Sequence, residues 1–190
     1  MIAPSATREA LLEAAADHLQ RVGWASFSFR DLAAVVGIRA PSIHHHFPTK
    51  GDLGVALVGW MRQRRAAHEA SLMEAYPDPR DRLLALGDVI AEHICAQHQS
   101  CPIYALQAEF PVLPEAVQKE VSAWIEDAIA GLTRWLAEGR ARGSLRFPGE
   151  AADHALVVWS VLQQGTQLTR TRPGTDFRLL VRQLVAGMTP

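Results

Sequence analysis

The sequence has no apolar run of the roughly 18 residues that a membrane-spanning helix needs. Residues 1–5 also lack the basic and apolar blocks of a secretory signal peptide. We therefore expect a cytoplasmic protein with no membrane partner. The only two cysteines, Cys95 and Cys101, are expected to be free thiols in that compartment rather than a structural disulfide.

Signs of catalysis are equally scarce. No nucleophile, base and orienting group occur at a spacing typical of an enzyme, and there is neither a phosphate-binding loop nor a pair of carboxylates that would support catalysis. An all-α enzyme that uses histidines and Glu109 is therefore the weakest function considered. We expect no catalytic residue and no cofactor.

Two clusters bear on metal binding. Residues 44–46 are three consecutive histidines, but consecutive helical side chains point about 100° apart and cannot converge on one ion. Cys95, His98 and Cys101 offer three zinc ligands across an expected helix break, with His93 as a fourth candidate. The sequence supports this zinc site less well than it supports a redox role for the cysteines, so no metal site is predicted.

Charge is distributed unevenly along a chain whose net charge is only −1. Residues 1–65 carry eight Lys and Arg against five Asp and Glu, whereas the remainder carries eleven against fifteen. A basic N-terminal part before an acidic remainder is typical of a small DNA-binding head on a different kind of body. The hydrophobic content of 48% is sufficient for a substantial core.

Helical periodicity dominates the sequence and no convincing alternating strand occurs, so the predicted fold is all-α with about nine helices. The first, over 7–22, has Leu11, Leu12, Ala15, Leu19 and Val22 on one face. Two short helices follow. The first begins with a capping box formed by Ser28 and Asp31 and ends at Gly37, and the second has Pro41 in its first turn. The remaining helices are predicted at about 51–76, 79–98, 102–110, 114–142, 150–170 and 175–187.

The two short helices, joined by a tight turn and braced by the first helix, have the spacing of a helix-turn-helix. In such a unit the first turn of the second helix contacts base edges in the major groove. Arg39 is suited to guanine, Ala40 and Pro41 are suited to a thymine methyl, and Ser42 completes the turn. Spacing alone does not separate this interpretation from an ordinary helix start in another all-α protein.

The residues themselves are more specific. Gly23-Trp24, then Ser28-Phe29-Arg30-Asp31-Leu32-Ala33, Gly37-Ile38, and Ile43-His44-His45-His46-Phe47 with Lys50 and Leu53 follow in fixed register. Over about residues 7–55 this pattern closely resembles the N-terminal signature of the TetR family of regulators. The resemblance implies a DNA-binding domain over 1–50 and a ligand-binding and dimerisation domain over 51–190.

The resemblance also implies roles for individual residues. Ser28 and Arg30 correspond to residues that contact or flank DNA phosphates, and His44, His45 and Lys50 to residues that grip the DNA backbone. Phe47 corresponds to a core residue of the head, and His46 to a residue that bridges head structure. His44 replaces the tyrosine that is usual at this position, so its contact with a DNA phosphate is expected to be weaker and pH-sensitive. Arg39 replaces a frequent serine, which removes an N-cap.

A regulator of this kind is expected to pair two chains on a pseudo-palindromic double-stranded DNA operator. The uncharged run 155–162 is apolar over too wide a surface for one buried stripe, so we expect it to face both the core and a second chain. The predicted interface residues on the last two helices are Leu156, Trp159, Phe177, Leu180, Val181 and Leu184.

The resemblance further implies a repressor that a small ligand releases from DNA. Aromatic and polar residues on the body helices are the candidates for its pocket, although each aromatic is also an ordinary core residue. They are Trp60, His93, Cys101, Tyr104, Gln107, Phe110, Trp124, Trp159 and Gln163. Gly54 and Gly59 are expected either to let the 51–76 helix bend or to let it pack closely against the first helix.

Cys101 supports an alternative within the same fold. It precedes Pro102 at an expected helix start, where the helix dipole favours the thiolate. The stretch from Cys101 to Glu109 is similar to an element of a TetR subgroup in which some members sense electrophiles or oxidants through the cysteine. Pro102 replaces the leucine of that element, and an inert buried cysteine remains the other interpretation. A structural dimer that has lost DNA binding is a third hypothesis, opposed by the presence of Arg30 and Lys50.

Overall fold

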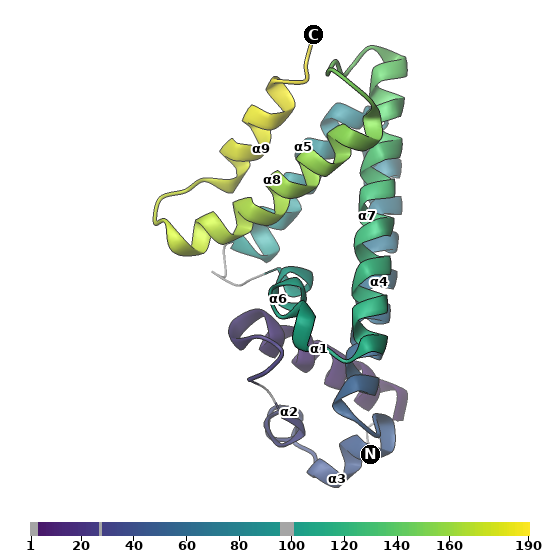
Figure 1. Ribbon diagram of the computed structural model, residues 1–190, viewed down its shortest axis with the longest axis vertical. Coiled ribbons are helices and arrows are strands. Elements are labelled where there is room, and N and C mark those ends of the chain that lie inside the picture. The colour runs from purple at the N-terminus through teal and green to yellow at the C-terminus, as the bar shows by residue number, and fades with distance from the viewer. Residues whose placement is uncertain (1–3, 27, 96–100) are drawn as a thin grey trace. The chain divides into compact units, whose positions relative to one another are not determined.

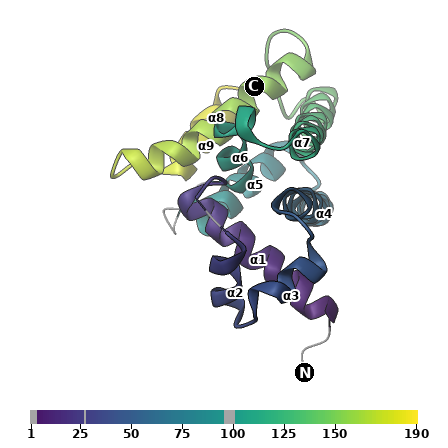
Figure 2. The same ribbon diagram turned by 60° about the horizontal axis from the view of Figure 1, so that its bottom comes forward.

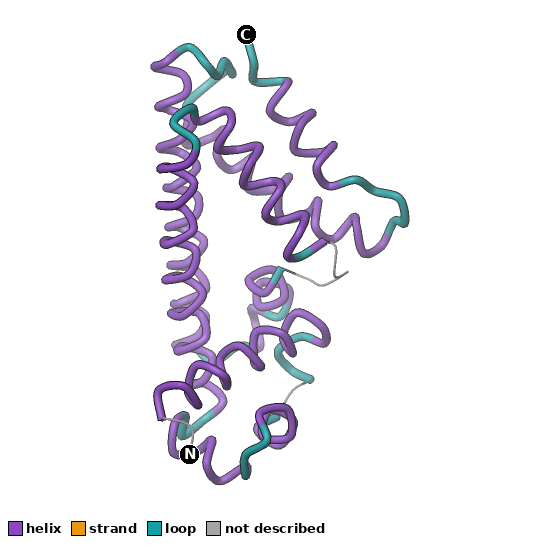
Figure 3. Tube along the Cα trace, turned by 180° about the vertical axis from the view of Figure 1, so that it is seen from behind, coloured by secondary structure: helices purple, strands orange, loops and turns teal. Residues whose placement is uncertain are grey.

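The computed structural model describes residues 4–26, 28–95 and 101–190. Over these residues it has nine α-helices and one 3-10 helix, and no strand (Figures 1 and 3). The all-α prediction is therefore confirmed.

The chain divides into two compact units, each built from two segments. The head unit comprises residues 1–64 and 102–124, and the body unit comprises residues 65–101 and 125–190. Two long helices, α4 (Lys50–Ala75) and α7 (Glu115–Arg142), contribute to both units. The functional division at residue 50 stays a prediction, but the compact units divide the chain at other points.

The head unit begins with α1 (Pro4–Val22), which starts three residues earlier than predicted. Leu11, Leu12, Ala15 and Leu19 are buried as expected. Val22 is 50% exposed, so its place on the buried stripe was wrong. It is the last helical residue, and Gly23 then takes a left-handed conformation, with φ of 84°, that ends the helix.

Further helices complete the core of the head unit. They are α2 (Phe29–Val36), α3 (Ala40–His46), α6 (Pro102–Ala108) and the 3-10 helix η2 (Phe110–Val112), with the adjoining halves of α4 and α7. Gly54 of α4 packs closely on the Trp24 ring and on Val117 of α7, with no room for a larger residue. A Cβ atom added at Gly59 would have no neighbouring atom within 4 Å outside its own helix backbone. The two glycines therefore differ, and only Gly54 serves close packing.

The body unit contains α5 (Pro79–His93), α8 (Ala151–Thr171), α9 (Phe177–Ala186) and the remaining parts of α4 and α7. The prediction that α5 extends to about 98 was too long, because the helix ends at His93, where the N–H of Ile94 caps it by donating to the Ile90 carbonyl. Residues 96–98 of that prediction lie outside the described residues. The core of the body unit contains residues from all five of these helices. Within it α9 packs on α5 through Val181, which lies directly against Gly87. Among the described residues, no helix is long and apolar enough to span a membrane.

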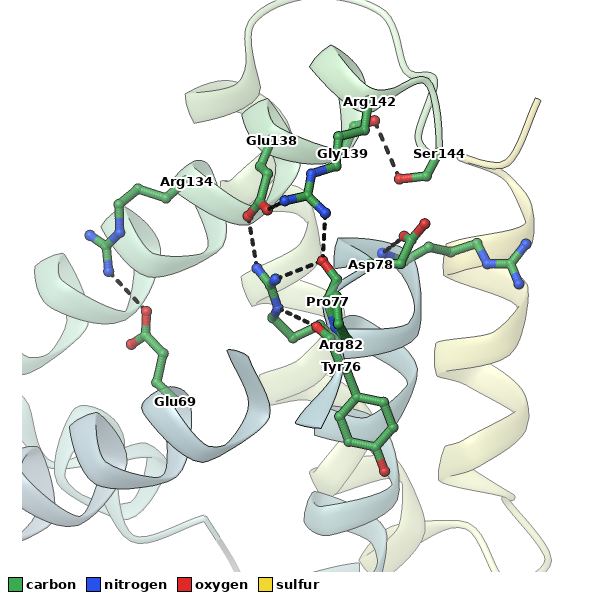
Figure 4. Close-up of polar contacts among 11 residues, drawn as sticks. Glu69, Tyr76, Pro77, Asp78, Arg82, Arg134, Glu138, Gly139, Arg142 and Ser144 are labelled. Carbon is green, nitrogen blue, oxygen red and sulfur yellow. Dashed lines mark hydrogen bonds and ion pairs between the residues drawn. The ribbon is translucent and has the colours of Figure 1, made fainter. Parts of the chain in front are cut away.

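One buried cation organises the turn between α4 and α5. Arg82, 2% exposed, donates from Nε to the Tyr76 carbonyl and from a terminal nitrogen to the Pro77 carbonyl, both at 3.1 Å (Figure 4). It also pairs with Glu138 of α7, and its guanidinium lies 5.3 Å from the centre of the Trp135 ring. These contacts tie the turn to α7 within the body unit.

Candidate functional site

The helix-turn-helix of the head is built by local hydrogen bonds. The Ser28 hydroxyl accepts from the Asp31 backbone N–H, and the Asp31 carboxylate accepts from the Ser28 N–H, which is the predicted capping box at the start of α2. Gly37, with φ of 75°, ends α2 in the left-handed conformation. Pro41 then lies in the first turn of α3. Figure 2 shows α2 and α3 beside α1.

A small core fixes the angle between these helices. Leu32 of α2, Ile43 of α3 and Phe47 are each at most 2% exposed. The Arg8 guanidinium of α1 lies 5.2 Å from the centre of the Phe47 ring. The predicted core role of Phe47 is therefore confirmed.

The first turn of α3 presents most of the predicted base contacts to solvent. Arg39, Pro41 and Ser42 are exposed and Ala40 is half-buried. Arg39 occupies the N-cap position without a side-chain cap hydrogen bond, as its replacement of serine predicts. Its guanidinium has no hydrogen-bond or ion-pair partner within the described part of the chain. This surface is available to a macromolecule.

The predicted phosphate contacts fall into two groups. Arg30, His44 and His45 are exposed. Ser28 is exposed as well, but its hydroxyl donates its hydrogen to the Asp31 carboxylate at 2.7 Å. The Ser28 hydroxyl and N–H together hold the pKa of the Asp31 carboxyl below its usual value. A phosphate contact through the Ser28 hydroxyl would have to replace that bond.

Lys50 is also engaged by the protein. Its ammonium donates to the Trp24 carbonyl at 2.5 Å and lies 4.8 Å from the centre of the Trp24 ring. Burial lowers the pKa of this ammonium, and the carboxylate of Glu109 opposes that shift. The predicted grip on a phosphate is untested, and it would require Lys50 to leave these partners.

The Pro48 carbonyl favours one tautomer of the neutral His44 ring. The Nδ1 atom of His44 lies 3.1 Å from the Pro48 carbonyl oxygen, which can only accept, so Nδ1 carries a hydrogen. The ring packs edge-on against Phe29 at a centroid distance of 4.9 Å. Neutral His44 therefore offers only an acceptor at Nε2, and a bond from Nε2 to a phosphate oxygen requires the protonated ring.

Glu109 is a head residue whose contacts the sequence did not reveal. It directly follows α6, and its two carboxylate oxygens accept from the backbone N–H groups of Trp24 at 2.7 Å and Ala25 at 2.9 Å. Its partners lie 85 and 84 residues away in the chain. The sequence singled it out only as a candidate residue of an all-α enzyme and as the end of the element that begins at Cys101.

The pocket candidates are divided between the two units. The head unit holds Trp60, Tyr104, Gln107, Phe110 and Trp124, all half-buried. The Gln107 Oε1 atom is buried and has no hydrogen-bond partner in the described structure. The Arg64 guanidinium covers the Trp60 ring at 4.7 Å.

The body unit holds the other four candidates, His93, Cys101, Trp159 and Gln163. His93 is exposed, and its Nδ1 lies 3.0 Å from the Val89 carbonyl oxygen. Cys101 and Gln163 come together, with the Gln163 amide nitrogen 3.9 Å from the Cys101 sulfur. The Gln163 Oε1 atom is buried and has no hydrogen-bond partner among the described residues.

The two cysteines have different surroundings. Both are free thiols; Cys95 is buried, whereas Cys101 is half-buried. Burial raises the pKa of the Cys95 thiol, and a hydrogen bond with the Thr169 side chain only partly opposes that shift. His98 lies outside the described residues, and no other group of three metal-ligating side chains occurs within them.

Known proteins resemble this arrangement closely. The profile of "Bacterial regulatory proteins, tetR family" matches residues 11–57, the helix-turn-helix and the start of α4. A solved TetR-family transcriptional regulator from Agrobacterium tumefaciens is 33% identical, with a TM-score of 0.88 over 98% of this chain and 100% of that one. The chain belongs to the TetR family.

Another TetR-like relative is named as a repressor. The HTH-type transcriptional repressor NemR of Escherichia coli K12 is 27% identical over 162 residues, which are 82% of this chain and 79% of NemR. The reduced form of E. coli NemR has a TM-score of 0.80 over 97% of both chains at 24% identity, which shows the shared fold. This TetR-family member is therefore a transcriptional regulator with the head and body helices of its relatives.

The structure separates the predicted interface residues of this TetR-family chain into two kinds. Phe177 and Val181 are 2% and 3% exposed and fill the core of the body unit, against Gly165 and Gly87. Leu156 is 50% exposed, and Trp159, Leu180 and Leu184 are half-buried. Val157 of α8 and Leu179 of α9 are further exposed apolar residues, at 49% and 47%.

Proposed function

We propose that the protein is a homodimeric repressor that binds a pseudo-palindromic DNA operator through α3 and leaves it when a small ligand binds. The exposed first turn of α3, with Arg39, Pro41 and Ser42 on a buried core, is the observation that carries the DNA-binding role. The guanidinium of Arg39 is suited to two parallel hydrogen bonds with guanine.

Pairing follows from the geometry of DNA. Two reading helices must lie about 34 Å apart to enter successive major grooves on one face of the duplex. Leu156 and Val157 of α8 and Leu179, Leu180 and Leu184 of α9 give an apolar surface for this purpose. A second copy of the chain would bury it.

Two buried amide oxygens indicate the chemistry of the ligand. The Oε1 atoms of Gln107 in the head unit and Gln163 in the body unit lack hydrogen-bond partners within the described residues. A buried acceptor without a donor costs about 1–3 kcal/mol. At either oxygen taken by itself, a ligand hydroxyl or amino group that donates a hydrogen bond would remove this cost.

The experiment that tests DNA binding begins with a duplex selected by the wild-type protein from a random-sequence pool. The affinities for that duplex and for a random duplex of equal length are measured over a range of salt concentrations. The Arg39→Ala variant is expected to lose preference at one base pair, by about 1–3 kcal/mol per half-site. Arg21→Ala, which removes the same charge from α1, is the control. Equal affinity of the wild type for both duplexes would contradict the proposal.

The similarity of residues 101–109 to the cysteine element of a TetR subgroup and the contact of Cys101 with Gln163 favour a second candidate, a regulator that responds to electrophiles. The Cys101 thiolate would add to an electrophilic alkene such as N-ethylmaleimide, forming a C–S bond, and the resulting enolate would take a proton from water. If this candidate holds, N-ethylmaleimide releases DNA from the wild type but not from Cys101→Ala. A Cys101→Ala variant that still releases DNA excludes it.

A further inference from the structure

We propose that the peptide group between Trp24 and Ala25 is the joint through which α6 positions the DNA-reading helices, with Glu109 and Lys50 as its positioning residues. The proposal rests on the DNA-binding function proposed above. Glu109 holds this peptide from the end of α6, and Lys50 holds it from the first turn of α4.

The hydrogen bonds from Lys50 and to Glu109 lie on opposite sides of one rigid peptide group. The Ala25 N–H, which donates to Glu109, and the Trp24 C=O, which accepts from Lys50, belong to the same planar peptide. In a trans peptide these groups point in opposite directions, and the described chain has no cis peptide. Both hydrogen bonds involve a charged side chain and are therefore of the stronger kind. The peptide cannot move without moving both side chains.

The surrounding packing leaves little freedom for another arrangement. The preceding residue is Gly23, and a side chain there would collide with the Glu109 carboxylate. The Trp24 ring is 5% exposed and packs against Gly54 and under the Lys50 ammonium. The end of α1, the start of α4 and the end of α6 thus meet at Trp24.

The joint links the sensing candidates to the reading helix through a short path. Tyr104 and Gln107 lie on α6, five and two residues before Glu109. Lys50 is the first residue of α4 and comes four residues after His46, the last residue of α3. A ligand that displaces α6 therefore displaces the Trp24–Ala25 peptide through Glu109 and changes the position of α3.

This role for Lys50 differs measurably from a phosphate contact. Loss of a phosphate contact weakens binding to every DNA sequence and lowers the salt slope by about one. Loss of a positioning residue instead misplaces α3, so it reduces the preference for the selected duplex and leaves the salt slope unchanged.

The test compares two variants with matched controls. Glu109→Gln keeps the shape of the side chain but offers one acceptor oxygen to two N–H donors, and Lys50→Met keeps the stem on Trp24 without the donor. The controls are Glu115→Gln and Lys119→Met, which remove an exposed ion pair of α7 in the same unit. The DNA probes are a duplex selected from a random pool by the wild type and a random duplex of equal length.

Both positioning variants are expected to lose about 10- to 100-fold in the ratio of selected to random affinity, the scale of one charged hydrogen bond. The controls are expected to stay within about twofold. Unchanged ratios in both variants overturn the joint. For Lys50→Met, a salt slope lower by about one, with equal losses on both duplexes, assigns Lys50 to a phosphate and also overturns it.

A further measurement uses the wild-type protein alone, so it requires neither a folded variant nor DNA. Hydrogen exchange in the wild-type protein is expected to show the Trp24 and Ala25 amides protected as strongly as the interior of α1. Fast exchange of both amides overturns the proposal. If the wild type binds no DNA but protects these amides, the proposed function fails while the structural joint stands.

Discussion

The guanidinium of Arg82 lies 2.9 Å from the carboxylate of Glu138, although only 3% of the Arg82 side chain is exposed. Glu138 also pairs with Arg142 at 2.7 Å, and Arg142 donates to the Pro77 carbonyl that Arg82 also contacts (Figure 4). The buried charge is therefore paired and satisfied by carbonyl oxygens, which is the condition for a cation to be stable in an interior.

Replacing Arg82 with alanine is expected to lower the free energy of unfolding by about 2–4 kcal/mol, because the Tyr76 carbonyl loses its side-chain donor and Glu138 loses its buried partner. Equilibrium denaturation at a fixed protein concentration measures this loss. Arg80→Ala, at an exposed position of the same turn, is the control and is expected to stay within about 0.5 kcal/mol. Equal effects of the two variants would contradict the assignment.

The two glycines of α4 give opposite predictions. A methyl group at Gly54 would lie 2.7 Å from the Trp24 ring and 2.8 Å from Val117, so Gly54→Ala is expected to destabilise the protein by about 1–3 kcal/mol. Gly59 has open space, so Gly59→Ala is expected to stabilise it by about 0.5–1 kcal/mol through helix propensity. Thermal unfolding of both variants tests the pair. A stabilising Gly54→Ala would show that the close contacts are easily relieved.

The exposed apolar surface of α8 and α9 gives a prediction about pairing. Leu156→Glu is expected to leave the protomer folded, because Leu156 is half exposed, and to convert a dimer into monomers by burying a charge at the interface. Analytical ultracentrifugation measures the mass, and Val112→Glu is the control at a 70% exposed position of η2. A Leu156→Glu dimer as tight as the wild type places the interface elsewhere.

The cysteines are expected to react at different rates. Iodoacetamide should modify Cys101 at least about tenfold faster than Cys95. Cys95 is buried, and its raised pKa keeps the thiol protonated at neutral pH. Since the pKa of Cys95 is raised, its rate should continue to increase as the pH rises above the usual range for cysteine. Mass spectrometry of digested peptides follows both sites, and the rates should converge in concentrated urea. Faster labelling of Cys95 in the folded protein would be inconsistent with this burial.

Local features of the fold were predictable because they depend on neighbouring residues. The capping box of Ser28 and Asp31, the helix end at Gly37 and the place of Pro41 in the first turn of the next helix all appear as predicted. The end of α5 was not predictable in this way, because the sequence continues with helix-compatible residues beyond His93. Apolar periodicity also placed Val22 in the core, although the terminal turn of α1 leaves it exposed.

The candidate site was predictable only in part, for a physical reason. Exposure of Arg39 and Ser42 follows from the helix-turn-helix pattern itself. The engagement of Lys50 by Trp24, and of Trp24 by Glu109, depends on contacts between segments 26 and 85 residues apart. Helical periodicity carries no information about such pairs. The same limit applies to Phe177 and Val181, whose pattern fits a protomer core and a dimer interface equally well.

The head unit is discontinuous, and this has a consequence for building chimeric regulators. Ile103 and Leu106 of α6 and Val117 of α7 are each at most 1% exposed within a unit that otherwise comes from residues 1–64. An N-terminal fragment transplanted onto another body would leave α1 without α6, which packs against it, and Trp24 without the carboxylate of Glu109. We therefore expect a chimera to keep the head unit intact only if residues 1–64 and residues 102–124 are exchanged together.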